Sequence, residues 1–198
     1  IEAFGAAALN SALAPIGETL PKGLSGTKAV DYTYGKLGDA YDALLPNLKG
    51  DLNATAGAGA LPSVAGQPAN LSFRQKLDNL KQMGQNLPPE QRSQLNAIID
   101  KEVVGQFTTS GLASGETLKS IESLLGSIAK KKGLSDNYHE NQLGLAVKQI
   151  QADMRAMVNE VNPSYQGELA KINSGYANFK IAQKAATSVA APDGVFSP

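Results

Sequence analysis

The sequence contains no cysteine and only one histidine, His139. Without cysteine, the chain has no disulfide framework, no thiolate metal ligand and no cysteine nucleophile. An imidazole metal site would need further ligands at helical spacing from His139, and the neighbouring Glu140 points to another helix face. We therefore expect no metal and no cofactor, and we expect His139 at the surface or in a helix cap.

The chain also lacks an excess of charge of either sign. Lys and Arg total 18, and Asp and Glu total 18, in 198 residues. Such a balance creates no net field that attracts nucleic acid or an acidic membrane over long range, so we expect no sequence-specific nucleic-acid binding. No apolar run reaches the roughly 18 residues needed to cross a bilayer, and the opening lacks the basic start of a secretion signal. Because residue 1 is Ile and not Met, we expect the chain to be part of a longer or processed polypeptide.

Apolar residues spaced three and four apart are the main pattern that the sequence does contain. The first clear set is Val30, Tyr34, Leu37, Tyr41, Leu44 and Leu48. This spacing places all six side chains on one face of a helix. Pro46 should end or kink that helix near Leu45. We predict that this stripe packs against a neighbouring chain in an oligomer.

Five further helical patterns follow, and no run alternates with period two over a convincing length. They cover residues 72–86, 89–107, from Ser114 or Gly115 to Gly133, from Ser135 or Asp136 to Val161, and from Ser164 to Ala186. Ser72 is predicted to be an N-cap and Pro89 the first residue of its helix. The predicted buried faces of the first three carry Phe73, Leu77, Leu80, Met83, Leu95, Ile98, Ile99, Val103, Phe107, Leu118, Ile121, Leu124, Leu125 and Ile128.

Together these patterns predict an all-α protein, a multi-helix bundle of about six helices. Residues 1–46 are predicted to form a separate N-terminal helical segment that serves oligomerisation or lies close to a membrane. Residues 47–71, rich in Gly, Ala and Pro, are predicted to be a linker. The bundle is predicted to cover residues 72–189, because short connections favour antiparallel packing of neighbouring helices. Residues 190–198 are then the start of a connection to further chain.

The residues offer no catalytic signature. The carboxylates are scattered, and acid–base catalysis needs two of them converging in a cleft. Glu116 or Glu122 is a candidate for a lone catalytic acid, but the sequence places no aromatic residue of a sugar-binding cleft near either of them. The run from Lys130 to Lys132 suits the negative end of a helix dipole better than a phosphate site. We therefore assign no catalytic residue.

Three stretches of the sequence resemble patterns in proteins of tailed bacteriophages and prophages. They are "LGDAYDALLP" at 37–46, "SGETLKSIESLLG" at 114–126, and "NPSYQGELAKINSGYANFKIAQKAATSVAAPDGVFSP" at 162–198. The last combines a Pro-led helix, an Asn-x-x-Tyr-Ala core, an Ala-Ala pair and an Asp-Gly-Val-Phe-Ser-Pro ending. Its positions are Pro163, Asn173, Tyr176, Ala177, Ala185, Ala186, Asp193, Gly194, Val195, Phe196, Ser197 and Pro198.

The family that these stretches resemble is that of virion-associated internal or ejection (pilot) proteins of short-tailed bacteriophages. The resemblance implies a non-enzymatic protein of the virion that forms a homo-oligomer and assists genome delivery. It implies other virion proteins as partners (portal, tail or ejection proteins), contact with a host membrane, and the host cell envelope as the location after ejection. The alternatives are a cell-wall hydrolase used in phage entry, another tail or portal structural protein, and a bacterial helical adaptor or secreted effector.

Overall fold

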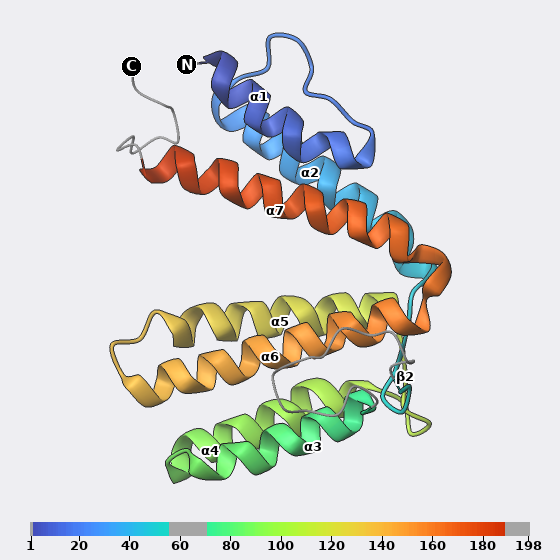
Figure 1. The fold of residues 1–198 in the computed structure, drawn as a ribbon, viewed down its shortest axis with the longest axis vertical. Coiled ribbons are helices and arrows are strands. Elements are labelled where there is room, and N and C mark those ends of the chain that lie inside the picture. Colours follow the sequence, from blue (N-terminus) through green and yellow to red (C-terminus); the bar gives the residue numbers. More distant parts are fainter. Residues whose placement is uncertain (1, 56–70, 189–198) are drawn as a thin grey trace. The chain divides into compact units, whose positions relative to one another are not determined.

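Seven α-helices dominate the part of the chain that the computed structural model describes, residues 2–55 and 71–188 (Figure 1). They are α1 (Glu2–Leu13), α2 (Gly26–Leu44), α3 (Phe73–Met83), α4 (Pro89–Ala97), α5 (Gly115–Gly133), α6 (Tyr138–Val161) and α7 (Gln166–Ser188). Two short strands, β1 (Lys49–Asp51) and β2 (Leu112–Ser114), pair antiparallel with Gly50 opposite Ala113. The predicted all-α fold is confirmed.

The chain divides into two compact units. Unit 1 combines the residues up to Leu44 with those from Ser164 onward and contains α1, α2 and α7; unit 2 is Leu45–Pro163 and contains the other four helices and both strands. This division differs from the predicted one, which set residues 1–46 apart from a bundle of residues 72–189. In the structure, α7 packs against α1 and α2. Periodicity shows that α7 has an apolar face, but it does not show which helices cover that face.

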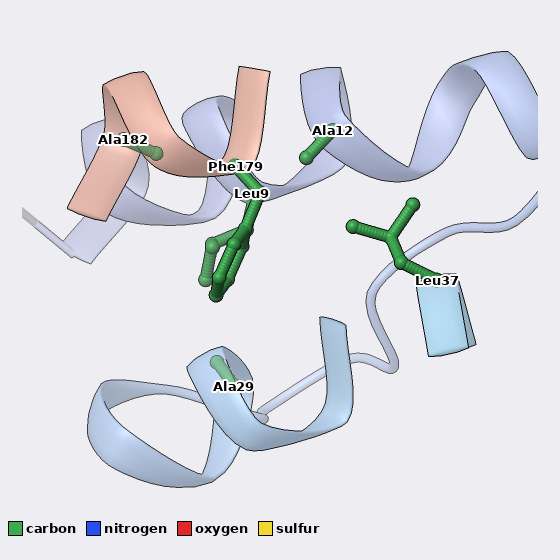
Figure 2. Close-up of a cluster of buried hydrophobic side chains, with 6 residues drawn as sticks. All are labelled: Leu9, Ala12, Ala29, Leu37, Phe179 and Ala182. Carbon is green, nitrogen blue, oxygen red and sulfur yellow. The ribbon is translucent and has the colours of Figure 1, made fainter. Parts of the chain in front are cut away.

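The core of unit 1 lies where α1, α2 and α7 meet. Figure 2 shows six of its buried side chains, Leu9, Ala12, Ala29, Leu37, Phe179 and Ala182. Three of the six are alanines, which allow the helix backbones to approach one another, while the ring of Phe179 fills the remaining space. The Asn178 side chain adds a polar link between α7 and α1, because its Nδ2 donates to the carbonyl oxygen of Ser11 at 3.0 Å.

Gly175 is the point at which α7 lies closest against both of its neighbours in this core. A Cβ atom at this position would lie 2.6 Å from Leu37 Cδ2 and 2.8 Å from the carbonyl oxygen of Ala12. Glycine inside a helix costs about 1 kcal/mol relative to alanine. Here the lack of a side chain is needed for the backbone of α7 to reach that of α1.

In unit 2, α6 is the central helix and packs against α3, α4, α5 and β1. Its predicted apolar stripe is buried, from Leu143 through Val147 and Ile150 to Met154 and Val158. Burying one such side chain contributes roughly 1.5–3 kcal/mol. The antiparallel neighbour α5 comes close at Gly144, where a Cβ would lie 3.1 Å from the amide nitrogen of Gly133. The stripe of α6 therefore holds the other elements of unit 2 together.

Most of the buried faces predicted for α3, α4 and α5 are observed. The residues found buried are Phe73, Leu77, Leu80, Leu95, Ile98, Ile99, Val103, Phe107, Leu118, Ile121 and Leu125. The prediction was wrong for Met83, which is 59% exposed, and for Leu124, which is 39% exposed. Met83 is the last residue of α3. Leu124 and Leu125 are adjacent, so their side chains leave the helix about 100° apart and only Leu125 faces the core.

Two predicted helix starts are confirmed by their cap geometry. The Ser72 side chain accepts a hydrogen bond from the Gln75 amide at 3.3 Å, and the Gln75 side chain accepts one from the Ser72 amide at 2.9 Å. Ser114 caps α5 by accepting from the Thr117 amide at 3.3 Å. Each bond satisfies an amide that the first helical turn leaves without a partner.

The predicted start of α6 at Ser135 or Asp136 was wrong. The cap is Asn137, whose Oδ1 accepts from the amides of His139 and Glu140 at 2.8 and 3.3 Å. The Ser135 hydroxyl instead accepts from the Asn137 amide at 3.2 Å and stabilises the preceding turn. Both side chains are good cap formers, so the sequence alone did not distinguish them.

The helix predicted over residues 89–107 begins at Pro89 as expected but does not stay a regular α-helix. It changes to a π-helical segment at Ile98–Val103 and then to a 3₁₀ turn at Val104–Gln106. Ile98 and Ile99, at the start of the π-helical segment, are both buried.

The first part of the predicted linker is packed structure. Leu48 and Leu52 are buried, and β1 lies between them. The Asn162 side chain holds this segment: its Oδ1 accepts from the Lys49 amide at 3.0 Å, and its Nδ2 donates to the carbonyl oxygens of Lys49 at 2.8 Å and Val158 at 2.7 Å. These partners are remote in sequence, so the linker composition did not reveal them. Residues 56–70 of the predicted linker, and the predicted connection at 190–198, lie outside the described residues.

Replacing Gly175 tests the close approach in unit 1. We expect Gly175→Ala to lower the free energy of unfolding by about 1–3 kcal/mol, because the added Cβ meets the backbone of Ala12, which cannot rotate away. Gly167→Ala is the matched control in the same helix, since nothing lies within 4 Å of a Cβ there. The control should leave stability unchanged or raise it by up to about 1 kcal/mol. Urea unfolding followed by circular dichroism measures both, and equal effects would contradict the packing described.

Candidate functional site

The stripe predicted to contact another chain is largely used inside its own chain. Leu37 is fully buried in the core of unit 1, Val30 packs against the same core, and Leu44 is buried at the end of α2. Leu48 follows a 3₁₀ turn at Leu45–Asn47 and is buried in unit 2. Pro46 lies in that turn, as expected, so the six residues do not continue along one helix face.

Three members of the stripe, Val30, Tyr34 and Tyr41, are not fully buried, and Tyr34 is the most exposed of them. Tyr34 is 60% exposed, and Tyr41 is half-buried. The ring of Tyr34 lies edge-on to Tyr176 with the centroids 6.3 Å apart, and 5.9 Å from Phe179. One side of the ring thus covers the apolar face of α7 while the rest meets solvent. A contact between chains through this stripe stays a prediction, and Tyr34 is its most accessible residue.

A buried ion pair connects α3 to α6. Lys76 Nζ lies 3.7 Å from Asp153 Oδ1, and the two side chains are 9% and 2% exposed. Gln149 Nε2 donates to Asp153 Oδ2 at 3.1 Å. Removing two charges from water is costly, so such a pair depends on its geometry and on the hydrogen bonds around it.

Sequence reasoning missed this pair, although a signal was present. Asp153 lies three residues after Ile150 and next to Met154, and Lys76 lies three residues after Phe73 and next to Leu77. Both charged residues therefore fall on apolar helix faces. The sequence could have placed each in the core, but it could not have shown that the two face one another.

A polar cluster joins α4, α5 and α6 at one end of unit 2. Lys132 Nζ donates to Gln94 Oε1 at 2.7 Å and forms an ion pair with Glu140 at 2.5 Å. Gln91 Nε2 donates to the other carboxylate oxygen of Glu140 at 3.1 Å. The hydrogen bond from Lys132, and then that from Gln91, lower the pKa of Glu140, and burial opposes them. Lys132, the last lysine of the run, thus has a structural role.

The two carboxylates weighed as catalytic acids do not converge. They are six residues apart on α5, which places their side chains about 120° apart around the helix axis. Glu122 Oε1 accepts from Arg155 Nε at 2.6 Å, so that carboxylate is engaged by α6. Glu116 is exposed in the first turn, where the helix dipole favours a negative charge. His139 is exposed in the first turn of α6 beside the Tyr138 ring, which confirms its predicted surface position.

Among the described residues, no group of three or more His, Asp or Glu side chains is arranged to hold a metal ion. No helix in those residues combines the length and apolar character needed to cross a bilayer. No family model matches the chain, and no match was found among curated proteins or solved structures.

The buried ion pair leads to a double-mutant prediction. Asp153→Ala should lower the free energy of unfolding by about 3–5 kcal/mol, because it leaves the Lys76 charge buried without its counter-ion. The double variant Lys76→Met/Asp153→Leu should regain most of this loss, because neither side chain then carries a buried charge. Arg155→Ala, which breaks the exposed pair with Glu122, is the control and should cost less than about 1 kcal/mol. Urea unfolding checks the set, and a double variant no more stable than Asp153→Ala would refute the interpretation.

The lowered pKa of Glu140 predicts a pH-dependent contribution to stability. The folded state favours the carboxylate, so the contribution is present above the pKa of the unfolded chain and is lost as the pH falls through the lower folded pKa. Glu140→Gln should therefore cost roughly 1 kcal/mol at neutral pH and almost nothing in strong acid. The measurement is the free energy of unfolding of the unchanged protein and of Glu140→Gln at a series of acid pH values. In a Lys132→Met background the same substitution should lose most of its pH-dependent effect, and an undiminished effect would count against the assigned cause.

Proposed function

We propose that this protein is a structural component of a bacteriophage virion, an internal or ejection protein that assists genome delivery through an oligomeric helical assembly. It acts by packing against copies of itself and against other virion proteins, without an active site. One observation carries the proposal: the three stretches that resemble phage proteins supply contacts that hold each unit together.

The first of these contacts lies in unit 1. The stretch at 37–46 forms the last part of α2, and the stretch from 162 onward includes α7. Leu37 fits against Gly175, and a Cβ at Gly38 would lie 4.0 Å from the hydroxyl oxygen of Tyr176. Tyr176 belongs to the Asn-x-x-Tyr-Ala core of the resemblance. That residue therefore serves the packing of α7 against α2.

The second contact lies in unit 2, between the end of the stretch at 37–46 and the start of the stretch at 114–126. A Cβ at Gly115 would lie 2.1 Å from the carbonyl oxygen of Leu45, so only glycine fits at this point. Its neighbour Ser114 is the N-cap of α5. Glycine and serine at these positions fix the start of α5 against the 3₁₀ turn at Leu45–Asn47. The shared residues thus have structural tasks, which supports a structural function over a catalytic one.

Another tail or portal structural protein is the main alternative within the same class, since helix packing does not identify a position in the particle. The hydrolase alternative gains no support from its candidate acids, because Glu122 is bound by Arg155 and Glu116 lies in an exposed helix turn. The closing Asp-Gly-Val-Phe-Ser-Pro motif at 193–198 lies outside the described residues.

Light scattering after size-exclusion chromatography tests the assembly. We expect the mass of an oligomer, at least twice that of the 20.6 kDa chain. Tyr34→Ser should weaken the association about tenfold or more, because an exposed tyrosine at the centre of an interface typically contributes more than 1 kcal/mol. Ile181→Ser, at a side chain that is 68% exposed on α7, is the control and should leave the mass unchanged.

A monomer at every concentration would contradict the proposal. So would hydrolysis of purified cell wall in a zymogram, which the enzyme alternative requires. The zymogram and the mass measurement are independent, so they separate the two classes of function.

A further inference from the structure

The turn between α5 and α6 presents two large apolar side chains to solvent. Leu134 is 76% exposed, and Tyr138 is 68% exposed. Lys130 and Lys131, in the last turn of α5, are exposed beside them. We call these four residues the hairpin tip; the turn that carries them joins α5 to α6 at one end of unit 2 (Figure 1).

The backbone that carries the hairpin tip is held by several hydrogen bonds. The Asn137 side chain caps α6, and Asn141 Nδ2 donates to the carbonyl oxygen of Ser135 at 2.6 Å. The amide of Leu134 donates to the carbonyl oxygen of Lys130 at 3.2 Å. Leu134 and Tyr138 are therefore exposed from a backbone that these hydrogen bonds hold in place.

The charges around the hairpin tip favour an anionic partner. Lys132 is already paired with Glu140 and faces Gln94, so it belongs to the structural cluster. Lys130 and Lys131 remain at the surface, and the exposed carboxylate of the same turn is Asp136. Two lysines beside one aspartate leave the exposed surface of the turn positive.

We infer that the hairpin tip docks on the surface of an anionic lipid bilayer. Leu134 and Tyr138 enter the boundary between headgroups and acyl chains, while Lys130 and Lys131 reach the lipid phosphates. Lysine stems lie along apolar surface with the ammonium in the polar layer, and tyrosine is enriched at this depth because its ring is apolar and its hydroxyl is polar. Apolar contact and attraction to anionic lipid then act together.

The composition of the tip favours lipid over a protein partner. A stable protein interface covers about 800 Å² on each partner, and lysine is depleted from its core. Here two exposed lysines in the last turn of α5 accompany the exposed apolar pair. A bilayer adapts to such a tip without a matching surface. The inference goes beyond the proposed function, and lipid docking can fail without affecting the oligomer.

The absence of tryptophan from the sequence allows a sharp test. In Leu134→Trp the introduced indole is the sole tryptophan, and we expect its emission to shift to shorter wavelength when vesicles of phosphatidylglycerol and phosphatidylcholine are added. Ile181→Trp, at a similarly exposed site on α7, should show no shift. Vesicles of phosphatidylcholine alone should give a smaller shift, because their surface carries no net negative charge to attract the lysines.

The second measurement is vesicle flotation, which compares the binding of each variant with that of the unchanged protein. Leu134→Ser/Tyr138→Ser should reduce binding tenfold or more, and Lys130→Gln or Lys131→Gln about fivefold each. Leu145→Ser, at a side chain that is 55% exposed on α6, should leave binding unchanged.

Three results would overturn the inference. One is unchanged emission of Leu134→Trp with the anionic vesicles, and another is an equal shift of Ile181→Trp. The third is a shift that grows with protein concentration without any vesicle, since it would identify a second copy of the chain as the occupant of the tip. Circular dichroism is the check that each variant is folded, which we expect for changes at exposed positions.

Discussion

The side chain of Asn162 holds the end of unit 2 against its beginning, and the rest of the architecture depends on this clamp. It bonds both the amide and the carbonyl of Lys49, as a neighbouring strand would, although the two residues are 113 positions apart. Lys49 follows α2, and Asn162 precedes α7. The chain therefore enters and leaves unit 2 at points that lie close together.

Close backbone contact at glycine is the second shared feature, and it occurs in both units. Gly175 allows α7 to reach α1 and α2, Gly115 lies against Leu45, and Gly144 lies against the end of α5. Each glycine weakens its own helix, so its value lies in the contact that it permits. A chain whose distinctive residues serve such contacts is suited to a structural task, which is why the proposed function is assembly and not catalysis.

The candidate sites were predictable only where the evidence was local. The predicted surface position of His139 is confirmed. That prediction needed only local evidence, namely that no further metal ligands lie at helical spacing from the single histidine. Lys132 was expected near a helix end, but its bonds to Glu140 and Gln94 join three helices whose proximity no spacing encodes. The pair of Lys76 and Asp153 was missed for the same reason. Tyr34 was assigned to the stripe, while the extent of its exposure followed from how α7 covers α2.

The sequence by itself determined the helices, most of their caps and most of their buried faces. These features arise within one or two helical turns: Ser72 meets Gln75 three residues later, and apolar side chains three and four apart share a face. Only the tertiary structure decided that α7 joins α1 and α2, that β1 pairs with β2, and that Asn162 clamps Lys49. An apolar stripe shows that a helix face is packed against another element, but it does not identify that element. The packing partner depends on the fit of side chains that are far apart in the chain.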